Sequence, residues 1–394
     1  MDEVRMVRDA YPEPAPPTAR EIARAKALLD DPPRRSLPRL RWRLACGVLA
    51  TGTAAAVAVT FVGGNAPAPT GPVILDDRAA VLAAAEKAER QPVGRYWHSD
   101  VVSGQSYVVR SGTGTYAVIG AHNESFSWHG AERGMGEMYY GRDLPARPWT
   151  ARDEAVWRGS GAPSGIRVWS GDKYLTLTAR ATKWSSSGPE RGTNPGGGGD
   201  FLGKSAEELR NLPTDPAKLT ELFLKGGGGG LNPDGTPPKD PSGKRPPGKD
   251  PSGGRKAGGD QINRVSSLLL NSPMPPKVRA GLMRALAAQP GIHAIGRTAD
   301  PLGRRGIALA DGERATTVTG EWGGPKADRG TYRSREVVVF DERTGALLSR
   351  QNMLTRPGGP YAQMKPGFII EFQAVRSEGW SDTRPAPRPE LPYR

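Results

Sequence analysis

The sequence predicts an α+β protein: a short cytoplasmic arm, one transmembrane helix, and an extracytoplasmic antiparallel β-meander with packed helices, interrupted by a disordered insertion. Three observations predict this class. Residues 44–62 form an apolar run without charge, long enough to cross a bilayer. Short segments with alternating apolar and polar side chains recur over residues 95–177 and 292–372. Helical apolar stripes precede each set of strands.

Composition limits the size of the folded core and the kind of partner. Only 36% of the 394 residues are hydrophobic, while Gly (52) and Pro (38) are abundant, so part of the chain is loop. Lys and Arg exceed Asp and Glu by 14, which favours anionic partners: nucleic acid, anionic lipid or wall polymers. The preference for Ala, Gly, Pro and Arg resembles a high-GC actinobacterial proteome, in which arginine excess reflects codon usage, and we expect no nucleic-acid partner. The single cysteine, Cys46, excludes an intrachain disulfide and a multi-cysteine zinc site.

Residues 1–43 form the predicted cytoplasmic arm, which is partly helical. Thr18-Ala19-Arg20-Glu21 fits a capping box after two prolines and predicts a helix over residues 19–29. Two interpretations stay open: a docking peptide for a cytosolic protein partner, and a solvated tail whose arginines set topology and touch anionic lipid. The arm has no His or Cys before Cys46, unlike a zinc-containing anti-sigma domain.

Residues 44–62 form the predicted transmembrane helix, and the flanking charges orient it. Five arginines crowd its N-terminal side, whereas no positive charge follows until Arg78. The positive-inside rule then places the N-terminus in the cytoplasm and the C-terminal domain outside a single-pass cell-membrane protein. The alternatives are a cleavable signal peptide ending near Ala66-Pro67-Ala68 and a buried helix of a soluble protein.

Residues 63–75 read as a tether, and residues 76–225 as the first part of the extracytoplasmic region. Asp76-Asp77 open a helix over residues 78–89, and Ser205 begins another helix. Ser103-Gly104 is predicted to be a turn between two strands. The expected strands are 95–98, 106–109, 114–119, 124–128, 138–140, 167–169 and 173–177, and a further helix is expected at 217–224.

Residues 226–260 are predicted to be a disordered linker because no large apolar side chain lies between Leu231 and Ile262. The second extracytoplasmic part, 261–382, begins with a helix pair and continues as strands, with a hairpin turn at Asp341–Gly345. Residues 383–394 form a Pro-rich tail. One composite domain with an insertion and two separate domains fit the sequence equally well. The expected helices are 262–270 and 278–288, and the expected strands are 292–295, 306–309, 335–340, 346–348 and 367–372.

No group of residues commits the chain to a reaction. The four histidines lack metal-ligand spacing, and strand alternation puts His122 and His129 on opposite faces. Gly198–Ser205 has P-loop spelling without the preceding strand, and Ser170–Lys173 matches SxxK but reads as a hairpin turn. We therefore predict a protein that is not an enzyme, with no catalytic, cofactor-binding or metal residue.

Two residue sets leave room for other functions. Three carboxylates, Glu124, Glu132 and Glu137, would suit glycoside hydrolysis if two of them faced each other, but solvated surface acids are the simpler interpretation. Six tryptophans precede the linker, and most should be core, although some could line a cleft for a lipid, glycan or peptide. They are Trp97, Trp128, Trp149, Trp157, Trp169 and Trp184.

Four segments of the sequence look familiar together, and they span most of the chain outside the insertion: Asp77–Leu82, Leu212–Pro216, Leu270–Ala280 and Asp341–Gly345. With them the chain resembles a family of actinobacterial single-pass membrane-anchored proteins of unknown function. Genes of that family commonly lie beside genes for extracytoplasmic-function sigma factors. The order of helix and meander also resembles the half-open barrel of periplasmic lipoprotein carriers and their sigma-regulatory relatives, an analogy of fold alone.

The resemblance implies a non-enzymatic envelope protein that acts as a sensor or regulator linked to a sigma factor. The alternative is a membrane-tethered carrier for a lipid or wall glycan, and a weaker alternative is an extracellular hydrolase. An apolar cleft lined by tryptophans would favour the carrier, and clustered acids in a pocket would favour the hydrolase.

Overall fold

The structure is a computed structural model that describes residues 75–188, 197–199, 201, 205–225 and 257–393. All of them belong to the unit Thr60–Arg394. The predictions for the arm (1–43), the transmembrane helix (44–62), the tether up to residue 74 and the linker over 226–256 lie outside the described residues. The predicted end of the linker at residue 260 is wrong, because residues 257–260 are the first turn of a helix that continues to Asn271. No helix in the described ranges is long and apolar enough to span a bilayer.

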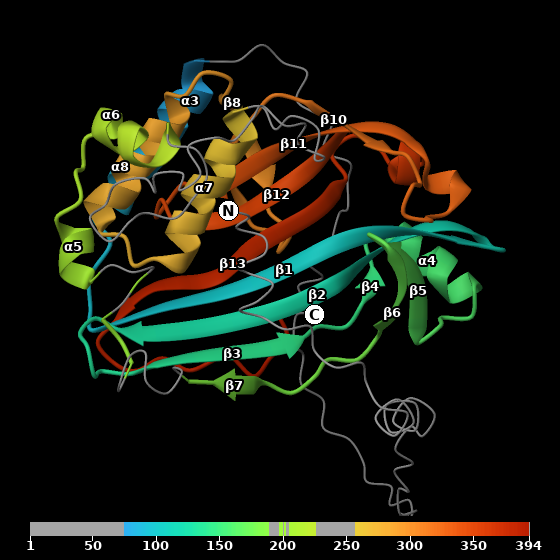
Figure 1. The fold of residues 1–394 in the computed structure, drawn as a ribbon, viewed down its shortest axis with the longest axis horizontal. Helices are drawn as coiled ribbons and strands as arrows, with labels where there is room; N and C mark the ends of the chain where they lie inside the picture. The colour runs from blue at the N-terminus through green and yellow to red at the C-terminus, as the bar shows by residue number, and fades with distance from the viewer. Residues whose placement is uncertain (1–74, 189–196, 200, 202–204, 226–256, 394) are drawn as a thin grey trace, which may run out of the picture. The chain divides into compact units, whose positions relative to one another are not determined.

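The chain is an α+β protein built on one large antiparallel sheet (Figure 1), which confirms the predicted class and strand direction. The sheet consists of β1 (Tyr96–Ser111), β2 (Gly114–Gly130), β3 (Glu137–Asp143), β4 (Arg147–Pro148), β7 (Ser185–Ser187), β8 (His293–Ala299), β9 (Arg305–Ala310), β10 (Arg314–Val318), β11 (Gly330–Phe340), β12 (Leu347–Arg356) and β13 (Ile369–Ser381). Their order is β7-β3-β2-β1-β13-β12-β11-β9-β8, with β10 beside β11 and β4 beside β2. A separate hairpin is formed by β5 (Gly165–Ser170) and β6 (Lys173–Thr178).

Strands from before and after the insertion lie in this one sheet. The central pair is β1 with β13, in which Val101 faces Val375 and Val102 faces Ala374. The parts before and after residues 226–256 therefore share one sheet, in agreement with the interpretation as one composite domain.

Helices cover one face of the sheet at its β8–β12 end. They are α3 (Leu75–Ala88), α5 (Ala206–Arg210), α6 (Pro216–Leu219), the π-helical turn η1 (Thr220–Leu224), α7 (Ala257–Asn271) and α8 (Pro276–Ala287). The apolar stripes predicted for α7 and α8 point into the main core, where Ile262, Leu269, Leu282 and Leu286 are buried. Each such side chain stabilises the fold by about 1.5–3 kcal/mol.

Helix α4 (Ala151–Gly159) has no counterpart among the predicted elements. It begins at a capping box in which Thr150 accepts from the Asp153 amide while the Asp153 carboxylate accepts from the Thr150 amide. The sequence Thr-Ala-Arg-Asp carried that signal. The helix packs beside a small second core that includes Tyr116, Val118 and Ile166.

The predicted turn at Ser103-Gly104 is wrong, because β1 runs through both residues. The chain departs there from regular pairing with β2 by a register shift between Ser103 and Gln105. Glycine is needed at position 104 since a Cβ atom would lie 2.6 Å from the Phe372 ring. The hairpin turns predicted at Asp341–Gly345 and Ser170–Lys173 are both present, between β11 and β12 and between β5 and β6.

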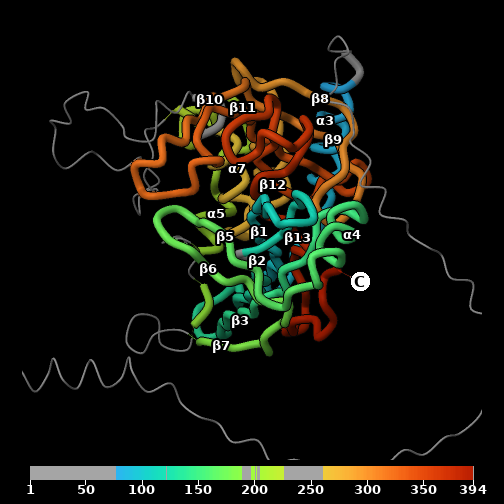
Figure 2. The backbone as a smooth tube through the Cα atoms, turned by 90° about the vertical axis from the view of Figure 1, so that its right-hand side faces the viewer, coloured from blue at the N-terminus to red at the C-terminus, as the bar shows by residue number. Residues whose placement is uncertain are grey.

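The two faces of the central strands have different cover. Val101 and Val375 pack toward the helices, whereas Val102, Phe372 and Ala374 face the other side. On that other side lies the C-terminal segment, residues 382–393, which is neither helix nor strand. Figure 2 shows this segment and α7 on opposite sides of β1, β2 and β13.

Candidate functional site beneath the C-terminal segment

Four charged side chains meet on the sheet face beneath the C-terminal segment. They are Asp100 of β1, Glu124 of β2, Arg142 of β3 and Arg376 of β13, and we call them the charged cluster. Glu124 lies directly opposite Arg142 in the β2–β3 pair, so both point to the same face. Asp100 and Glu124 are completely buried, and Arg142 nearly so.

Glu124 binds both arginines. Its Oε2 accepts a hydrogen bond of 2.7 Å from Arg142 Nε, and its Oε1 accepts one of 2.7 Å from Arg376 Nη1. One buried carboxylate thus orients two guanidinium groups, whose remaining N–H groups point toward the C-terminal segment. Such charge-assisted bonds are strong and hold a fixed geometry.

Asp100 adds a second carboxyl group that is not held by an arginine. Burial raises the pKa of Asp100 to about 7, and the nearby Glu124 charge adds to the rise, while Arg376 and Arg388 oppose it. Among the described residues, neither oxygen of Asp100 has a hydrogen-bond partner. Its neutral form is therefore favoured in the folded protein up to about neutral pH.

Three consecutive carbonyl groups of the C-terminal segment are bound by side chains. The Arg388 oxygen accepts from Trp184 Nε1 at 3.0 Å, and the Pro389 oxygen accepts from Arg142 Nη1 at 2.8 Å. The Glu390 oxygen accepts from Arg142 Nη2 at 2.6 Å and from Arg376 Nη1 at 2.9 Å. The two arginines of the charged cluster thus bind the segment to the sheet through its carbonyl groups.

The end of the segment inserts an aromatic ring. Tyr393 stacks under the Arg147 guanidinium, 3.8 Å from its carbon to the ring centroid, and its hydroxyl lies 3.1 Å from His122 Nε2. Burial lowers the pKa of His122 to about 4, so this imidazole is neutral at physiological pH. Burial also raises the pKa of Tyr393.

Aromatic rings border the rest of the segment. The Arg384 guanidinium lies over Trp128, at 4.7 Å from the ring centroid, and near Tyr96. Arg142 in turn lies 4.4 Å from the Trp184 ring. Such cation–π contacts stabilise partly exposed groups by about 0.5–1 kcal/mol each.

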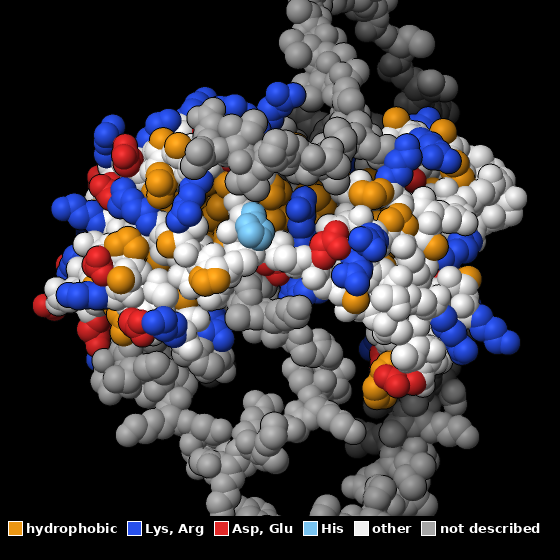
Figure 3. Space-filling model, turned by 90° about the horizontal axis from the view of Figure 1, so that it is seen from above, with side chains coloured by type: hydrophobic (Ala, Val, Ile, Leu, Met, Phe, Trp, Pro, Cys, Tyr) orange, Lys and Arg blue, Asp and Glu red, His pale blue; other side chains and the backbone are white. Residues whose placement is uncertain are grey.

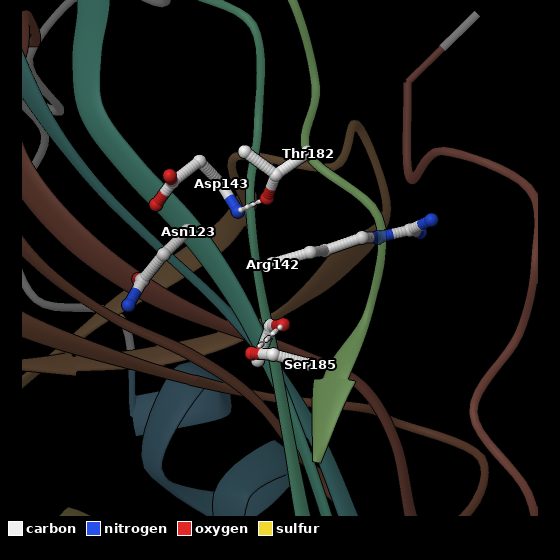
Figure 4. A pocket seen from close by; sticks show the side chains of 6 residues that line it. Asn123, Arg142, Asp143, Thr182 and Ser185 are labelled. Atoms are coloured by element: carbon white, nitrogen blue, oxygen red, sulfur yellow. Dashed lines mark hydrogen bonds between the residues drawn. The ribbon is translucent and has the colours of Figure 1, made fainter. Parts of the chain in front are cut away.

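A polar hollow of about 250 Å³ lies on the other side of Arg142. It is lined by Asn123, Gly141, Arg142, Asp143, Thr182 and Ser185. In Figure 4 the Asn123 and Asp143 side chains point one way, whereas the Arg142 side chain extends away from them. The hollow and the charged cluster therefore belong to opposite faces of β3, as strand alternation requires.

The histidines and glutamates considered as candidate site residues from the sequence do not come together in one site. His122 contacts Tyr393, whereas His129 contacts Phe201 on the helix side, so the prediction of opposite faces is confirmed. Glu137 pairs with His129 there, so it does not face Glu124. No group of three metal-ligating side chains occurs within the described ranges.

Sequence reasoning did not find the charged cluster as a site. Asp100, Arg142 and Arg376 were not singled out. Glu124 was considered as a possible acid for glycoside hydrolysis, but a solvated surface acid was preferred; that preference is wrong for Glu124, which is completely buried. A signal was present, since each of these charges sits inside a segment that pairs as a strand, with apolar or aromatic neighbours. Their convergence depended on the strand order, which the sequence did not reveal.

Comparisons with known proteins give little further direction. No protein-family model matches the chain, and no curated protein matches it. Among solved structures, the chain is similar to the crystal structure of LprF from Mycobacterium bovis. That likeness covers 80% of this chain and 99% of the other, at 8% sequence identity and a TM-score of 0.22. A TM-score this low supports no conclusion on fold or ligand.

Proposed function

We propose that this protein is a non-enzymatic, membrane-anchored envelope receptor, and that the sheet face beneath the C-terminal segment is its ligand-binding face. The observation that carries the proposal is the charged cluster, in which Glu124 orients Arg142 and Arg376. Their remaining N–H groups point away from the sheet, toward the position that a ligand would take. A buried carboxylate with two arginines is costly to desolvate and is not needed for a stable core. Perturbed ionisable groups of this kind concentrate at functional sites.

The geometry favours binding over hydrolysis. Both oxygens of Glu124 accept from guanidinium groups, and its side chain is completely buried, so this carboxylate already serves to orient two cations. Asp100, the group with the raised pKa, lies at the same cluster but beneath the bound segment. General acid catalysis requires a substrate within hydrogen-bond reach of the acid, whereas the Asp100 side chain is completely buried.

The link to a sigma factor rests on the resemblance described from Asp77–Leu82 and the other matching segments. In the proposed arrangement, residues 1–43 contact a cytosolic regulator, residues 44–62 cross the membrane once with the N-terminus inside, and the sheet domain reads a signal outside the cell. The strongly paired sheet with helices on one face also supports a half-open-barrel fold for this domain.

A second candidate is a membrane-tethered carrier for a wall glycan or lipid. The supporting observation is aromatic: Trp128 and Trp184 contact the C-terminal segment, and Trp149 packs against Phe372 on the same face. Flat aromatic rings suit sugar faces as well as peptides. The polar hollow beside Arg142 lies on the opposite face of β3, so it is not part of this aromatic face.

The distribution of charged side chains on the face seen from above does not indicate a further class of binding partner. Figure 3 shows Lys and Arg side chains spread across the view from above, with acidic and hydrophobic side chains among them. On that face the basic excess does not gather into one patch of the kind that nucleic acid requires.

In-cell crosslinking of the full-length chain tests the proposed coupling. We expect a tagged wild-type chain to crosslink to an extracytoplasmic-function sigma factor or its regulator. The matched control is Leu28→Glu with Leu29→Glu, which disrupts the predicted apolar face of the arm and should abolish the crosslink. If wild type and control recover the same cytosolic proteins, direct coupling through the arm is wrong.

A further inference from the structure

We infer that the face beneath the C-terminal segment is a docking groove for an extended, proline-rich peptide of another envelope protein, and that residues 384–393 are its resident occupant. The inference rests on the proposed receptor function and names the class of its ligand.

The resident segment has the composition of a polyproline II ligand. Pro385, Pro387, Pro389 and Pro392 occur within ten residues, and none of these residues joins the sheet. Proline fixes φ near −65° and removes a backbone donor, so such a peptide is extended before it binds and presents mainly carbonyl acceptors. Its binding therefore costs little conformational entropy.

The groove supplies the donors that such a ligand lacks. Successive carbonyl oxygens at positions 388, 389 and 390 accept from Trp184, Arg142 and Arg376. These donors come from β3, β13 and the residues just before β7, so the fold brings them together. Because recognition uses the backbone, a different chain with the same extended shape satisfies it.

The donors are held in place without help from the segment. Glu124 pairs with both arginines, and the Trp184 ring lies beside the Arg142 guanidinium. If the segment leaves, these contacts persist, while N–H groups of both arginines exchange peptide carbonyl groups for water. The arginines are then already oriented for an equivalent peptide, which lowers the entropic cost of binding it.

Three positions of the segment set the side-chain preference. Arg384 lies over Trp128, the Glu390 carboxylate lies 3.3 Å from Arg376, and Tyr393 fills the slot between His122 and Arg147. Leu391, in contrast, is 38% exposed. The partner peptide should carry a cation, then alternating prolines, an acid and a terminal aromatic ring.

Tethering gives the resident segment an advantage over any free competitor. A short tether produces an effective concentration on the order of millimolar. An external peptide of equal intrinsic affinity must overcome that concentration, so its apparent binding to the intact chain is weak. Cutting the tether removes the advantage, and apparent affinity should rise at least tenfold.

The test uses the full-length chain in detergent with a specific protease site inserted between Asp382 and Thr383. The probe is a fluorescein-labelled peptide with the sequence of residues 383–393. Its fluorescence anisotropy is measured before and after cleavage.

Two probe variants distinguish specific recognition from non-specific binding. Tyr393→Ala should weaken binding at least tenfold, whereas Leu391→Ala should change it less than twofold. In the protein, Arg142→Lys should also weaken binding at least tenfold because lysine cannot bind two carbonyl groups in one plane. Arg158→Lys, at an exposed helical pair, is its matched control.

Tighter peptide binding after cleavage, with these variant effects, would support the groove. No binding or no exchange after cleavage, equal binding of Tyr393→Ala and Leu391→Ala probes, or a preference for a wall glycan oligomer over the peptide would overturn it. If Arg142→Lys fails to fold by circular dichroism, the probe variants alone decide. The sigma-factor crosslink is measured separately, so failure of the peptide groove and failure of the receptor function are distinguishable.

Discussion

Replacing Glu124 by glutamine tests whether the charged cluster is an integral buried network. The change keeps the side-chain volume but removes the charge that holds two guanidinium groups. The side chains of Glu124, Arg142 and Arg376 are 0%, 4% and 10% exposed, so water screens the loss poorly. Removing one partner of a buried ion pair costs about 3–5 kcal/mol in the free energy of unfolding.

The neighbouring Asp100 carboxyl group affects how much stability the Glu124→Gln variant loses. Because the charge of Glu124 contributes to the raised pKa of Asp100, its removal lets Asp100 ionise more easily and act as a substitute counter-charge. Glu124→Gln alone should therefore fall near the lower end of that range at pH 8. The double variant with Asp100→Asn blocks the substitution and should lose more stability than the two single variants added together.

Urea unfolding followed by tryptophan fluorescence measures these differences. The matched control is Glu154→Gln, which removes the exposed i,i+4 pair with Arg158 and should cost only about 0.3–0.5 kcal/mol. If Glu124→Gln shifts the unfolding midpoint no more than Glu154→Gln does, the cluster is not the buried network described here.

Three further results are expected. The pKa of Asp100 is about 7 in the folded chain and near 3.8 when unfolded, so its contribution to stability is fully present below pH 3.8 and is lost as pH rises through 7. The stability of Asp100→Asn relative to wild type, from urea unfolding, should thus increase between pH 5 and pH 8; a flat difference would contradict the assignment. Tyr393→Ala should expose His122 and raise its pKa from about 4 toward 6.5, as read by NMR of labelled histidine, whereas Leu391→Ala should leave it unchanged. Gly281→Ala should destabilise the fold by about 1–3 kcal/mol, since a Cβ atom would lie 2.6 Å from the Thr214 carbonyl oxygen, while Gly159→Ala meets no atom within 4 Å and should be neutral or slightly stabilising in thermal unfolding.

Local patterns predicted the elements well where their signal lies within a few residues. The apolar stripes of α7 and α8 and the capping box at Ser205 specify helices without reference to the rest of the chain. The Asp341–Gly345 turn is likewise local, because Gly345 takes the positive φ that it needs. The prediction of a turn at Ser103-Gly104 failed because glycine is needed there to make room for the Phe372 ring on β13, not to form a turn.

The candidate site could not be predicted in the same way because its contacts span almost the whole domain. Arg142 and Pro389 are bonded across 247 residues, and Glu124 and Arg376 across 252. Pairing β1 with both β2 and β13 brings these groups together. Residues 383–394 were predicted only to be a Pro-rich tail, and nothing local indicated that Trp184, Arg142 and Arg376 bind its carbonyl groups.

The proposed function depends most on the prediction that the receptor domain lies outside the cell and that residues 44–62 anchor it. Protease treatment of intact spheroplasts tests this directly, with one epitope at the N-terminus and another inserted within residues 226–256. The internal position is preferable to a C-terminal tag because Tyr393 is packed against the sheet. The account predicts that the internal epitope is lost, that the N-terminal epitope survives, and that the chain sediments with the membrane. Survival of the internal epitope, or release of the domain into the medium, would contradict it.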